Sequence, residues 1–187
     1  MSPTIECGKG EREAILDAAK LMLIAARTAP KTAGADDIVT SIVYGEDKNH
    51  IANEMDKIAQ DRKSESFRRD ARNVRDSEAV VLIGVRGTKN TGLNCAACGC
   101  KDCQEFNKAD KKLGTDFVGP NCILKALDLG IALGSAAKTA STLNVDNRIM
   151  YRVGTAAMKL NLLPEATVIM GVPISAKGKS IYFDRSK

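Results

Sequence analysis

The sequence predicts an α+β protein in which helices surround a mixed sheet and a Cys-rich insert interrupts the pattern. Two observations carry this prediction. Segments with helical spacing of apolar residues alternate irregularly with short apolar runs, unlike the regular β-α-β order of a parallel sheet. Between residues 87 and 119, Gly, Asn, Lys and Cys replace the apolar periodicity. We expect one domain, 1–187, with 87–119 as an insert within it.

The first half of the chain contains two predicted helices and two predicted strands. Residues 11–27 are rich in Ala and Leu without Gly or Pro, which predicts a helix that ends before Pro30. The β-branched run 38–43 predicts a strand. Residues 50–60 carry apolar side chains on one helical face. Residues 79–85 are continuously apolar, which is typical of a central strand.

After the insert, the pattern predicts a long helix over 121–143, with Pro120 in its first turn. Small residues form a stripe that lets another backbone approach closely: Gly130, Gly134, Ala137 and Ser141. A further helix is expected over 147–160, a strand over 166–172, and an edge or tail strand over 180–183.

Composition excludes several classes of protein. An apolar fraction of 44% and a charged fraction of 27% are typical of a globular chain and exclude disorder. No apolar run approaches the roughly 18–20 residues of a membrane span. The first nine residues lack the basic and apolar regions of a signal peptide, so we expect a cytoplasmic protein without a membrane partner. A net charge of +5 suits an anionic ligand.

Four of the six cysteines lie within nine positions, 95–103. Cytoplasmic thiols are usually kept reduced, so dense cysteines favour metal binding or redox chemistry over disulfides. A single zinc ion usually takes two Cys pairs separated by a longer loop, and here the second pair follows at once. The spacing C-x2-C-x4-C with one remote Cys instead favours a [4Fe–4S] cluster. The expected ligands are Cys95, Cys98, Cys103 and Cys122.

Two points about the metal stay open. Cys100 could replace Cys98 or Cys103 as a ligand, and Cys7 is a further candidate ligand that is distant in the sequence. Zinc is the alternative metal, and reactive or merely structural thiols are the third reading. Cys122 stands at the start of the long predicted helix, where the helix dipole stabilises a thiolate or an anionic cluster.

Two pairs of cations are candidate phosphate ligands. Arg27 and Lys31 flank a Pro-bounded loop at a helix end, while Lys177 and Lys179 flank Gly178 after the last core strand. The competing interpretation is that all four are solvated surface cations. The sequence shows no clear acid–base pair, so no catalytic residue is assigned.

Two stretches outside the cysteines resemble a known family. Residues 23–34 read LIAARTAPKTAG and resemble the exit of the first helix in the FMN-dependent nitroreductase fold. Residues 127–132 (LDLGIA), Leu143-Asn144 and residues 162–173 (LLPEATVIMGVP) resemble its second half. With the cysteine insert between these halves, the chain resembles the uncharacterised ferredoxin-domain proteins of the domain-of-unknown-function 2148 family.

The resemblance implies a flavoprotein-like α+β fold, dimeric across the long helices, with an iron–sulfur motif added. Nitroreductases hold the FMN phosphate with an Arg-Arg-Ser-x-Arg motif, and this chain has Glu11-Arg12-Glu13 near that place. A flavin phosphate needs fixed cations and its ring needs close backbone approach. If FMN binds, we therefore expect it where the Arg27–Gly34 loop, the Asn144 exit loop and the Lys177–Lys179 segment converge, across a dimer interface.

Two functions of different classes follow. The first is an iron–sulfur redox or electron-transfer protein, a flavin-linked reductase of unknown substrate with a redox partner protein, and hence an oxidoreductase. The second is a zinc-knuckle nucleic-acid-binding module that uses the basic run 62–75. Glu65 and Asp70 interrupt that run and only Phe67 offers a ring there, so we do not expect nucleic acid as the partner.

Overall fold

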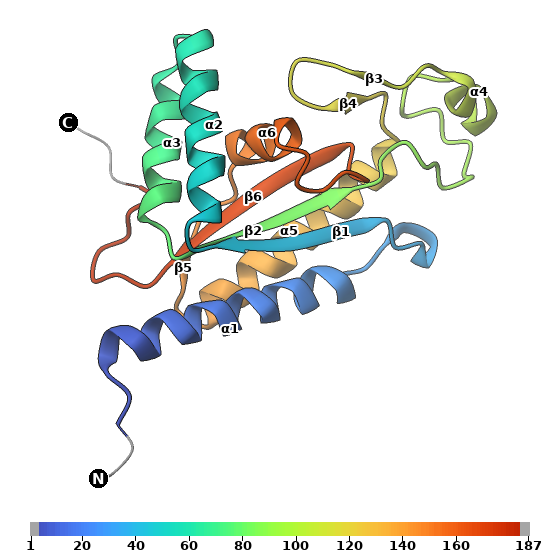
Figure 1. Cartoon of the computed structure of the whole chain (residues 1–187). Helices are drawn as coiled ribbons and strands as arrows, with labels where there is room; N and C mark the ends of the chain where they lie inside the picture. The colour runs from blue at the N-terminus through green and yellow to red at the C-terminus, as the bar shows by residue number, and fades with distance from the viewer. Residues whose placement is uncertain (1–3, 184–187) are drawn as a thin grey trace.

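The computed structural model describes residues 4–183 as a four-stranded sheet with helices on both faces (Figure 1). The strand order is β1-β2-β6-β5, so β2 and β6 are interior. The strands are β1 (Ile38–Tyr44), β2 (Ala79–Val85), β5 (Asp146–Asn147) and β6 (Val168–Ser175). The predicted α+β fold is confirmed. The strand directions are not mixed, because each neighbouring pair in this sheet is antiparallel.

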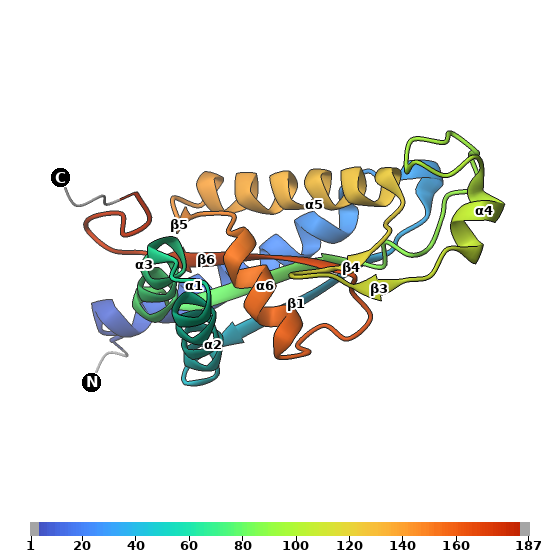
Figure 2. The same cartoon turned by 90° about the horizontal axis from the view of Figure 1, so that it is seen from above.

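Two apolar cores lie on the two faces of the sheet. On one face α1 (Cys7–Thr28) and α5 (Ile123–Thr142) pack against alternate residues of β2, among them Val81 and Ile83. On the other face α2 (Asp47–Asp61), α3 (Glu65–Asp76) and α6 (Tyr151–Lys159) pack against Val80 and Leu82. Because successive strand residues point to opposite faces, a strand buried on both sides must be continuously apolar. The two helical layers are visible in Figure 2.

Close packing of α6 on β6 depends on two glycines. A Cβ on Gly154 would lie 1.7 Å from the carbonyl oxygen of Ile169. A Cβ on Gly171 would lie 2.1 Å from Cγ1 of Val153. Neither contact is possible for a larger residue without moving the helix away from the sheet.

The helices differ in several places from the sequence prediction. The first begins at Cys7 and includes Gly8 and Gly10, four residues before the predicted start. The basic run, for which no element was predicted, contains α3, because Phe67, Ala71 and Val74 have helical spacing and are buried. The helix expected over 147–160 begins only at Tyr151. Its predicted start belongs instead to β5, which pairs with the end of β6.

The placement of Pro120 in the first turn of the long helix is wrong. α5 begins at Ile123, and Cys122 is its N-cap residue. Residues 120–122 are held outside the helix because the Cys122 N–H donates to the Gly87 carbonyl and the Asn121 side chain donates to the Val118 carbonyl. Within residues 4–183, no helix combines the length and apolar character needed to cross a membrane.

The strand expected over 180–183 is also wrong. The Tyr182 ring is buried, and its hydroxyl lies 2.9 Å from the Ser77 hydroxyl. Side chains rather than a strand partner bind the backbone there: Asn73 donates to the Ile181 carbonyl and Arg148 to the Tyr182 carbonyl. The segment is therefore anchored to α3 by side-chain contacts instead of extending the sheet.

Candidate metal centre and its surroundings

The cysteine insert has almost no apolar core of its own. Between residues 88 and 119, Phe106 is the only buried side chain. It lies in the six-residue helix α4 (Cys103–Lys108), and the ammonium of Lys111 is 3.6 Å from its ring centroid. A two-stranded hairpin, β3 (Lys112–Leu113) and β4 (Val118–Gly119), returns the chain to the body of the protein. Something other than hydrophobic burial must therefore organise this segment.

The turns around the cysteines are tight. Asn94, Ala96 and Gly99 have positive φ values of 48°, 57° and 86°, the left-handed backbone conformation found in tight turns. The Asn94 side chain accepts a hydrogen bond from the Cys103 N–H at 3.0 Å. The Asp102 carboxylate caps α4 by accepting from the Glu105 N–H at 2.8 Å. These contacts fix the backbone of the loop that carries the thiols.

The thiols of the loop lie close to the surface. Cys95 is exposed, whereas Cys98, Cys100 and Cys103 are half-buried. Burial and the neighbouring Cys98 thiol, which hydrogen-bonds Cys100, raise the pKa of the Cys100 thiol, while Lys111 acts in the opposite direction. Cys98 and Cys100 are thus side by side, which keeps both available as ligands.

Cys122 is placed differently from the other candidate ligands. The residue is 5% exposed and occupies the N-cap position of α5, where its side chain makes no capping hydrogen bond. Its N–H donates to the carbonyl of Gly87 at 2.8 Å, which ties the helix start to the beginning of the insert. The positive end of the α5 dipole favours a thiolate at this position.

Three residues hold the two ends of the insert together by hydrogen bonds and form its stem: Gly87, Asn121 and Thr167. The Thr167 hydroxyl accepts from the Gly87 N–H at 2.9 Å and donates to the Asn121 side-chain oxygen at 2.5 Å. A Cβ on Gly87 would lie 2.0 Å from that oxygen, so a larger residue here would displace the Asn121 side chain. The sequence pattern did not identify these three residues as supports of the site, because they are far apart in the chain.

The donor set fits an iron–sulfur cluster, since thiolates are its usual ligands. Within residues 4–183, no group of three or more Cys, His, Asp or Glu side chains is arranged to hold one metal ion. Metal sites of this kind commonly form only when the metal binds, because ligation and local folding are coupled. Cys7 starts α1 at the other end of the molecule from the insert (Figure 1). The structure therefore gives it no part in the site.

A buried ionic cluster lies one turn after Cys122. The Lys125 ammonium is 1% exposed and contacts Asp37 at 2.8 Å, Asp128 at 3.8 Å and the Ala35 carbonyl at 2.8 Å. Asp128 also accepts from the N–H and hydroxyl of Thr32. Burial opposes ionisation of Asp37, but hydrogen bonds from Lys125 and from Lys89 of the insert lower its pKa overall. The sequence analysis did not identify this cluster, although a Lys and an Asp three residues apart in an apolar helix are a signal that could have found it.

We predict that Lys125→Met destabilises the protein by about 3 kcal/mol at pH 7, because it leaves two buried carboxylates without their shared cation. Urea unfolding at pH 7 and at about pH 4 measures this. Asp37 has a lowered pKa, so its stabilisation is present above about pH 4 and lost as the pH falls through its folded pKa. The difference in the free energy of unfolding between wild type and variant should therefore be smaller at the lower pH. Lys138→Met, on the exposed surface of the same helix, is the matched control; equal losses in both variants would contradict the prediction.

The predicted cofactor residues form two separate groups within one chain. Arg27 pairs with Asp36 and donates to the Ile38 carbonyl at 2.9 Å. The Lys31 ammonium donates to three carbonyls at the end of α1, and burial lowers its pKa. Both residues lie beside the N-terminal part of α5, as the contact between Thr32 and Asp128 shows.

Asn144 and the Lys177–Lys179 segment lie at the opposite end of α1. Asn144 lines a cavity of about 370 Å³ with residues from the N-terminal half of that helix. The Lys177 ammonium donates to the Asp76 carbonyl and lies 4.0 Å from Glu78. One chain thus does not bring all of these residues to a single ligand, and their predicted convergence requires a second copy.

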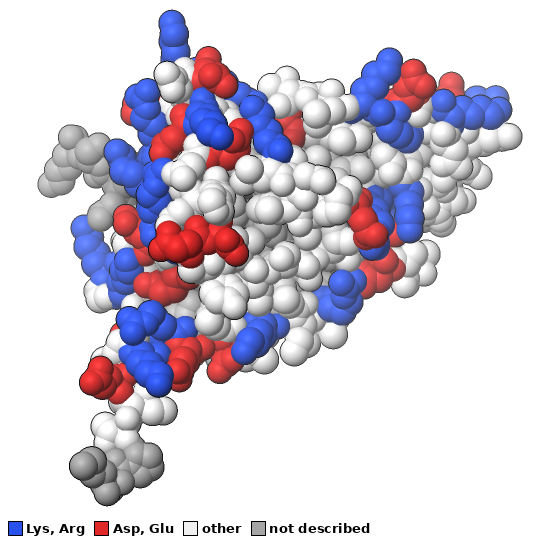
Figure 3. All heavy atoms as spheres, viewed as in Figure 1, with Lys and Arg blue, Asp and Glu red and all other residues white. Residues whose placement is uncertain are grey.

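Acidic residues neutralise much of the basic run. Arg62 pairs with Asp116, Arg68 with Glu65, Arg69 with Asp70, and Arg75 with Asp56. Figure 3 shows Lys and Arg interleaved with Asp and Glu over α2 and α3 rather than gathered in one basic patch. This pattern is typical of a solvated charged surface, and nothing in it favours the nucleic-acid alternative.

A contact that the sequence did not predict attaches the hairpin of the insert to the helical layer. Asp116 accepts from Arg62 at 2.6 Å and from the Tyr151 hydroxyl. The Phe117 and Tyr151 rings meet edge to face at 5.2 Å. Burial opposes ionisation of Asp116, but these hydrogen bonds lower its pKa overall. Burial and the hydrogen bond to Asp116 raise the pKa of Tyr151. The hairpin is thereby fixed against α2 and α6.

Comparison with known proteins supports the expected resemblance. Residues 118–185, which include Cys122 but not the 95–103 loop, match the family model of uncharacterised proteins containing a ferredoxin domain. An uncharacterised protein from Archaeoglobus fulgidus is 51% identical over 176 residues, which make up 94% of this chain and 94% of that protein.

Solved structures share the fold at low sequence identity. An oxidoreductase containing FMN superposes with a TM-score of 0.54 and 16% identity, covering 87% of this chain and 67% of the other. A nitroreductase family protein from Clostridium novyi NT gives 0.57 and 12%, covering 98% and 80%. The nitroreductase-like fold predicted from the sequence is confirmed.

Proposed function

The chain belongs to the family of uncharacterised proteins containing a ferredoxin domain, and from that premise we propose that it is an iron–sulfur redox protein. A [4Fe–4S] cluster would be held by Cys95, Cys98, Cys103 and Cys122, within a single domain whose 87–119 insert supplies three of the ligands. When bound, such a cluster supplies one-electron transfer. The chain would thus pass electrons between a redox partner protein and a second redox centre.

The construction of the insert is the observation that carries this proposal. Its loop holds four cysteines, it buries one side chain, and its turns are tight and glycine-rich. Such a segment gains little from hydrophobic burial, whereas ligation of a cluster would supply the missing stabilisation. The stem residues bring the start of the insert to Cys122, the one candidate ligand that belongs to the body of the fold.

This chain's own residues would tune such a centre. The N-terminus of α5 points its positive end at Cys122, and Lys111 lies close enough to Cys100 to influence the pKa of its thiol. Positive charge near thiolate ligands favours the reduced, more negative state and raises the reduction potential. Burial of Cys122 acts in the opposite direction, because a low dielectric disfavours added charge.

Iron and acid-labile sulfide assays on anaerobically purified protein test the proposal, together with an absorbance spectrum. We expect iron and sulfide in equal amounts and a broad shoulder at about 400 nm. Stoichiometric zinc without sulfide would reject the cluster in favour of the zinc alternative. A metal-free protein under these conditions would reject both metals and favour the interpretation that the thiols are structural or reactive.

We further propose that the chain is a homodimer across α1 and α5. Large apolar side chains are exposed along these helices, among them Leu127 at 55% and Ile131 at 45%. Among residues 4–183, a Cβ added to Gly130 or Gly134 would meet no atom within 4 Å, so these two positions of the small-residue stripe are open. A second copy would cover this face and allow the close backbone approach that the glycines permit.

A dimer is also what an FMN site would need. The fold is shared with an oxidoreductase containing FMN, and the two groups of predicted cofactor residues lie at opposite ends of α1. In an antiparallel pairing of two copies, Arg27 and Lys31 of one protomer would approach the Asn144 end of its partner. On this proposal the flavin is the second redox centre and the protein is a flavin-linked reductase.

We predict that replacing both Lys177 and Lys179 with Ala lowers FMN retention about tenfold while iron content stays unchanged, because a flavin phosphate needs fixed cations. Flavin released on denaturation is quantified by fluorescence, and iron is measured in the same sample. Lys57→Ala/Lys63→Ala, on the opposite face of the sheet, removes the same charge and serves as control. Unchanged flavin binding in the Lys177/Lys179 variant, or no flavin in any preparation, would remove this site.

A further inference from the structure

The N-terminal half of β1 forms a free edge of the sheet. The Arg86 N–H donates to the Asp37 carbonyl, which extends the β1–β2 pairing by one residue. This bond identifies which β1 residues have backbone groups directed toward β2. In an antiparallel pair every second residue bonds to the neighbouring strand, so the backbone groups of Ile38 and Thr40 face away from β2. Ile38 is already satisfied, because its N–H donates to Asp36 and its carbonyl accepts from Arg27. The Thr40 N–H is left pointing outward at the edge.

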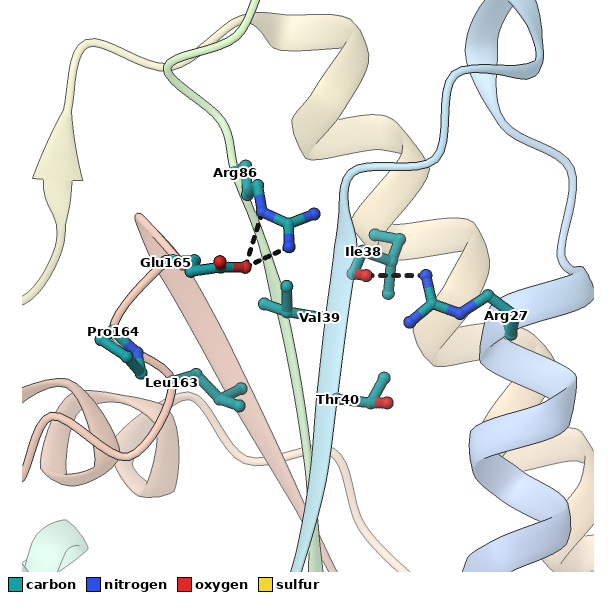
Figure 4. Close-up of a pocket in the computed structure, with 8 residues that line it drawn as sticks. All are labelled: Arg27, Ile38, Val39, Thr40, Arg86, Leu163, Pro164 and Glu165. Carbon is teal, nitrogen blue, oxygen red and sulfur yellow. Dashed lines mark hydrogen bonds and ion pairs between the residues drawn. The ribbon is translucent and has the colours of Figure 1, made fainter.

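Two arginines from different elements flank this edge. In Figure 4, Arg27 at the end of α1 lies on one side of β1, and Arg86 at the end of β2 lies on the other. Arg86 uses Nε and Nη2 to bind one oxygen of Glu165, at 2.9 Å from Nε. Its Nη1 has no partner among residues 4–183, and Figure 4 shows the guanidinium directed toward β1. The Glu165 side chain is 61% exposed, so it can swing into solvent at little cost.

A cavity of about 400 Å³ lies between these groups. Leu163, Pro164 and the side chain of Val39 form its apolar wall. This volume is in the range of small-molecule sites, which combine an apolar wall with a few converging polar groups. A guanidinium with free N–H donors binds a carboxylate or phosphate through two parallel hydrogen bonds, in bidentate geometry. The N–H at the strand edge supplies a third donor.

We propose that this cavity binds a small organic oxyanion that has a flat or short apolar body. The oxyanion would replace Glu165 as the partner of Arg86 and accept from the Thr40 N–H, while its apolar body rests on Leu163 and Pro164. Glu165 acts as an internal counterion that holds Arg86 in place when the site is empty. Arg86 directly precedes Gly87, whose carbonyl accepts from the Cys122 N–H, so the site adjoins the stem of the insert. The inference does not depend on the cluster, because binding is measured directly.

Benzoate and its neutral analogue benzamide are the probes, and titration is followed by the amide NMR signals of the isotopically labelled protein. Benzoate should shift the Thr40 amide in a saturable way, and benzamide at the same concentrations should not. Arg86→Gln should weaken benzoate binding about tenfold, since it removes the charge-assisted contacts. Glu165→Gln should strengthen it several-fold, because it removes the competing carboxylate. Glu13→Gln changes net charge equally on the exposed surface of α1 and should leave the affinity unchanged.

The opposite signs of these effects separate a built site from general attraction between charges. Equal shifts by benzoate and benzamide, or equal effects of Glu165→Gln and Glu13→Gln, would overturn the proposal. If Arg86→Gln unfolds, which thermal unfolding reveals, the Glu165→Gln comparison still decides. Iron content is measured in every sample, so loss of the cluster and loss of oxyanion binding are distinguished.

Discussion

Replacing Cys122 with Ser is expected to lower iron and sulfide from about four of each per chain to less than about one. The reason is that Cys122 is the one ligand fixed by the body of the fold, so its loss leaves the proposed cluster on a loop without a core. Both are measured after anaerobic purification, with the absorbance at about 400 nm as an independent readout. Circular dichroism on the same samples checks that the variant folds.

Serine variants of other cysteines supply the control and show which thiols are cluster ligands. Cys7→Ser should leave iron and sulfide unchanged, because Cys7 lies at the far end of the molecule and its thiol donates to Glu11. Cys98→Ser and Cys100→Ser decide which of these neighbouring thiols is the ligand, since only one of the two changes should remove the cluster. Full iron content in both Cys122→Ser and Cys98→Ser would reject the proposed ligand set.

The second large effect is expected on the oligomeric state. Leu127→Glu combined with Ile131→Glu should raise the dimer dissociation constant at least about a hundredfold, because burying unpaired carboxylates costs several kcal/mol. Sedimentation velocity over a concentration series measures this. Leu113→Glu is the matched control, since that leucine is equally apolar and 71% exposed but lies on the hairpin of the insert. A wild-type monomer, or equal dissociation of control and variant, would contradict the proposal.

This experiment also bears on the flavin. If the FMN site is shared between protomers, the dissociated variant should lose flavin although Lys177 and Lys179 are intact. Its iron content should not change, because the four proposed ligands belong to one chain. Flavin that remains bound to a monomer would place the site within a single chain.

Several elements could be predicted because their pattern is strong. The strand 79–85 is continuously apolar and occupies an interior position of the sheet, where both faces are buried. The helix in the basic run was missed, because seven of its twelve residues are charged and conceal the buried spacing of Phe67, Ala71 and Val74. Pro120 was misplaced because its neighbours Asn121 and Cys122 are held by partners distant in sequence, which a local pattern does not contain.

The sequence alone determined the alternation of helices and strands, the position of the insert and the candidate ligands. Each of these depends on residue type and on spacing along the chain, and both are local properties. Only the tertiary structure decided that the strands are antiparallel, that Arg27 and Asn144 lie at opposite ends of α1, and that Arg86 faces a cavity beside β1. These facts depend on which distant segments pack together, and packing is set by the burial of whole faces rather than by any single motif.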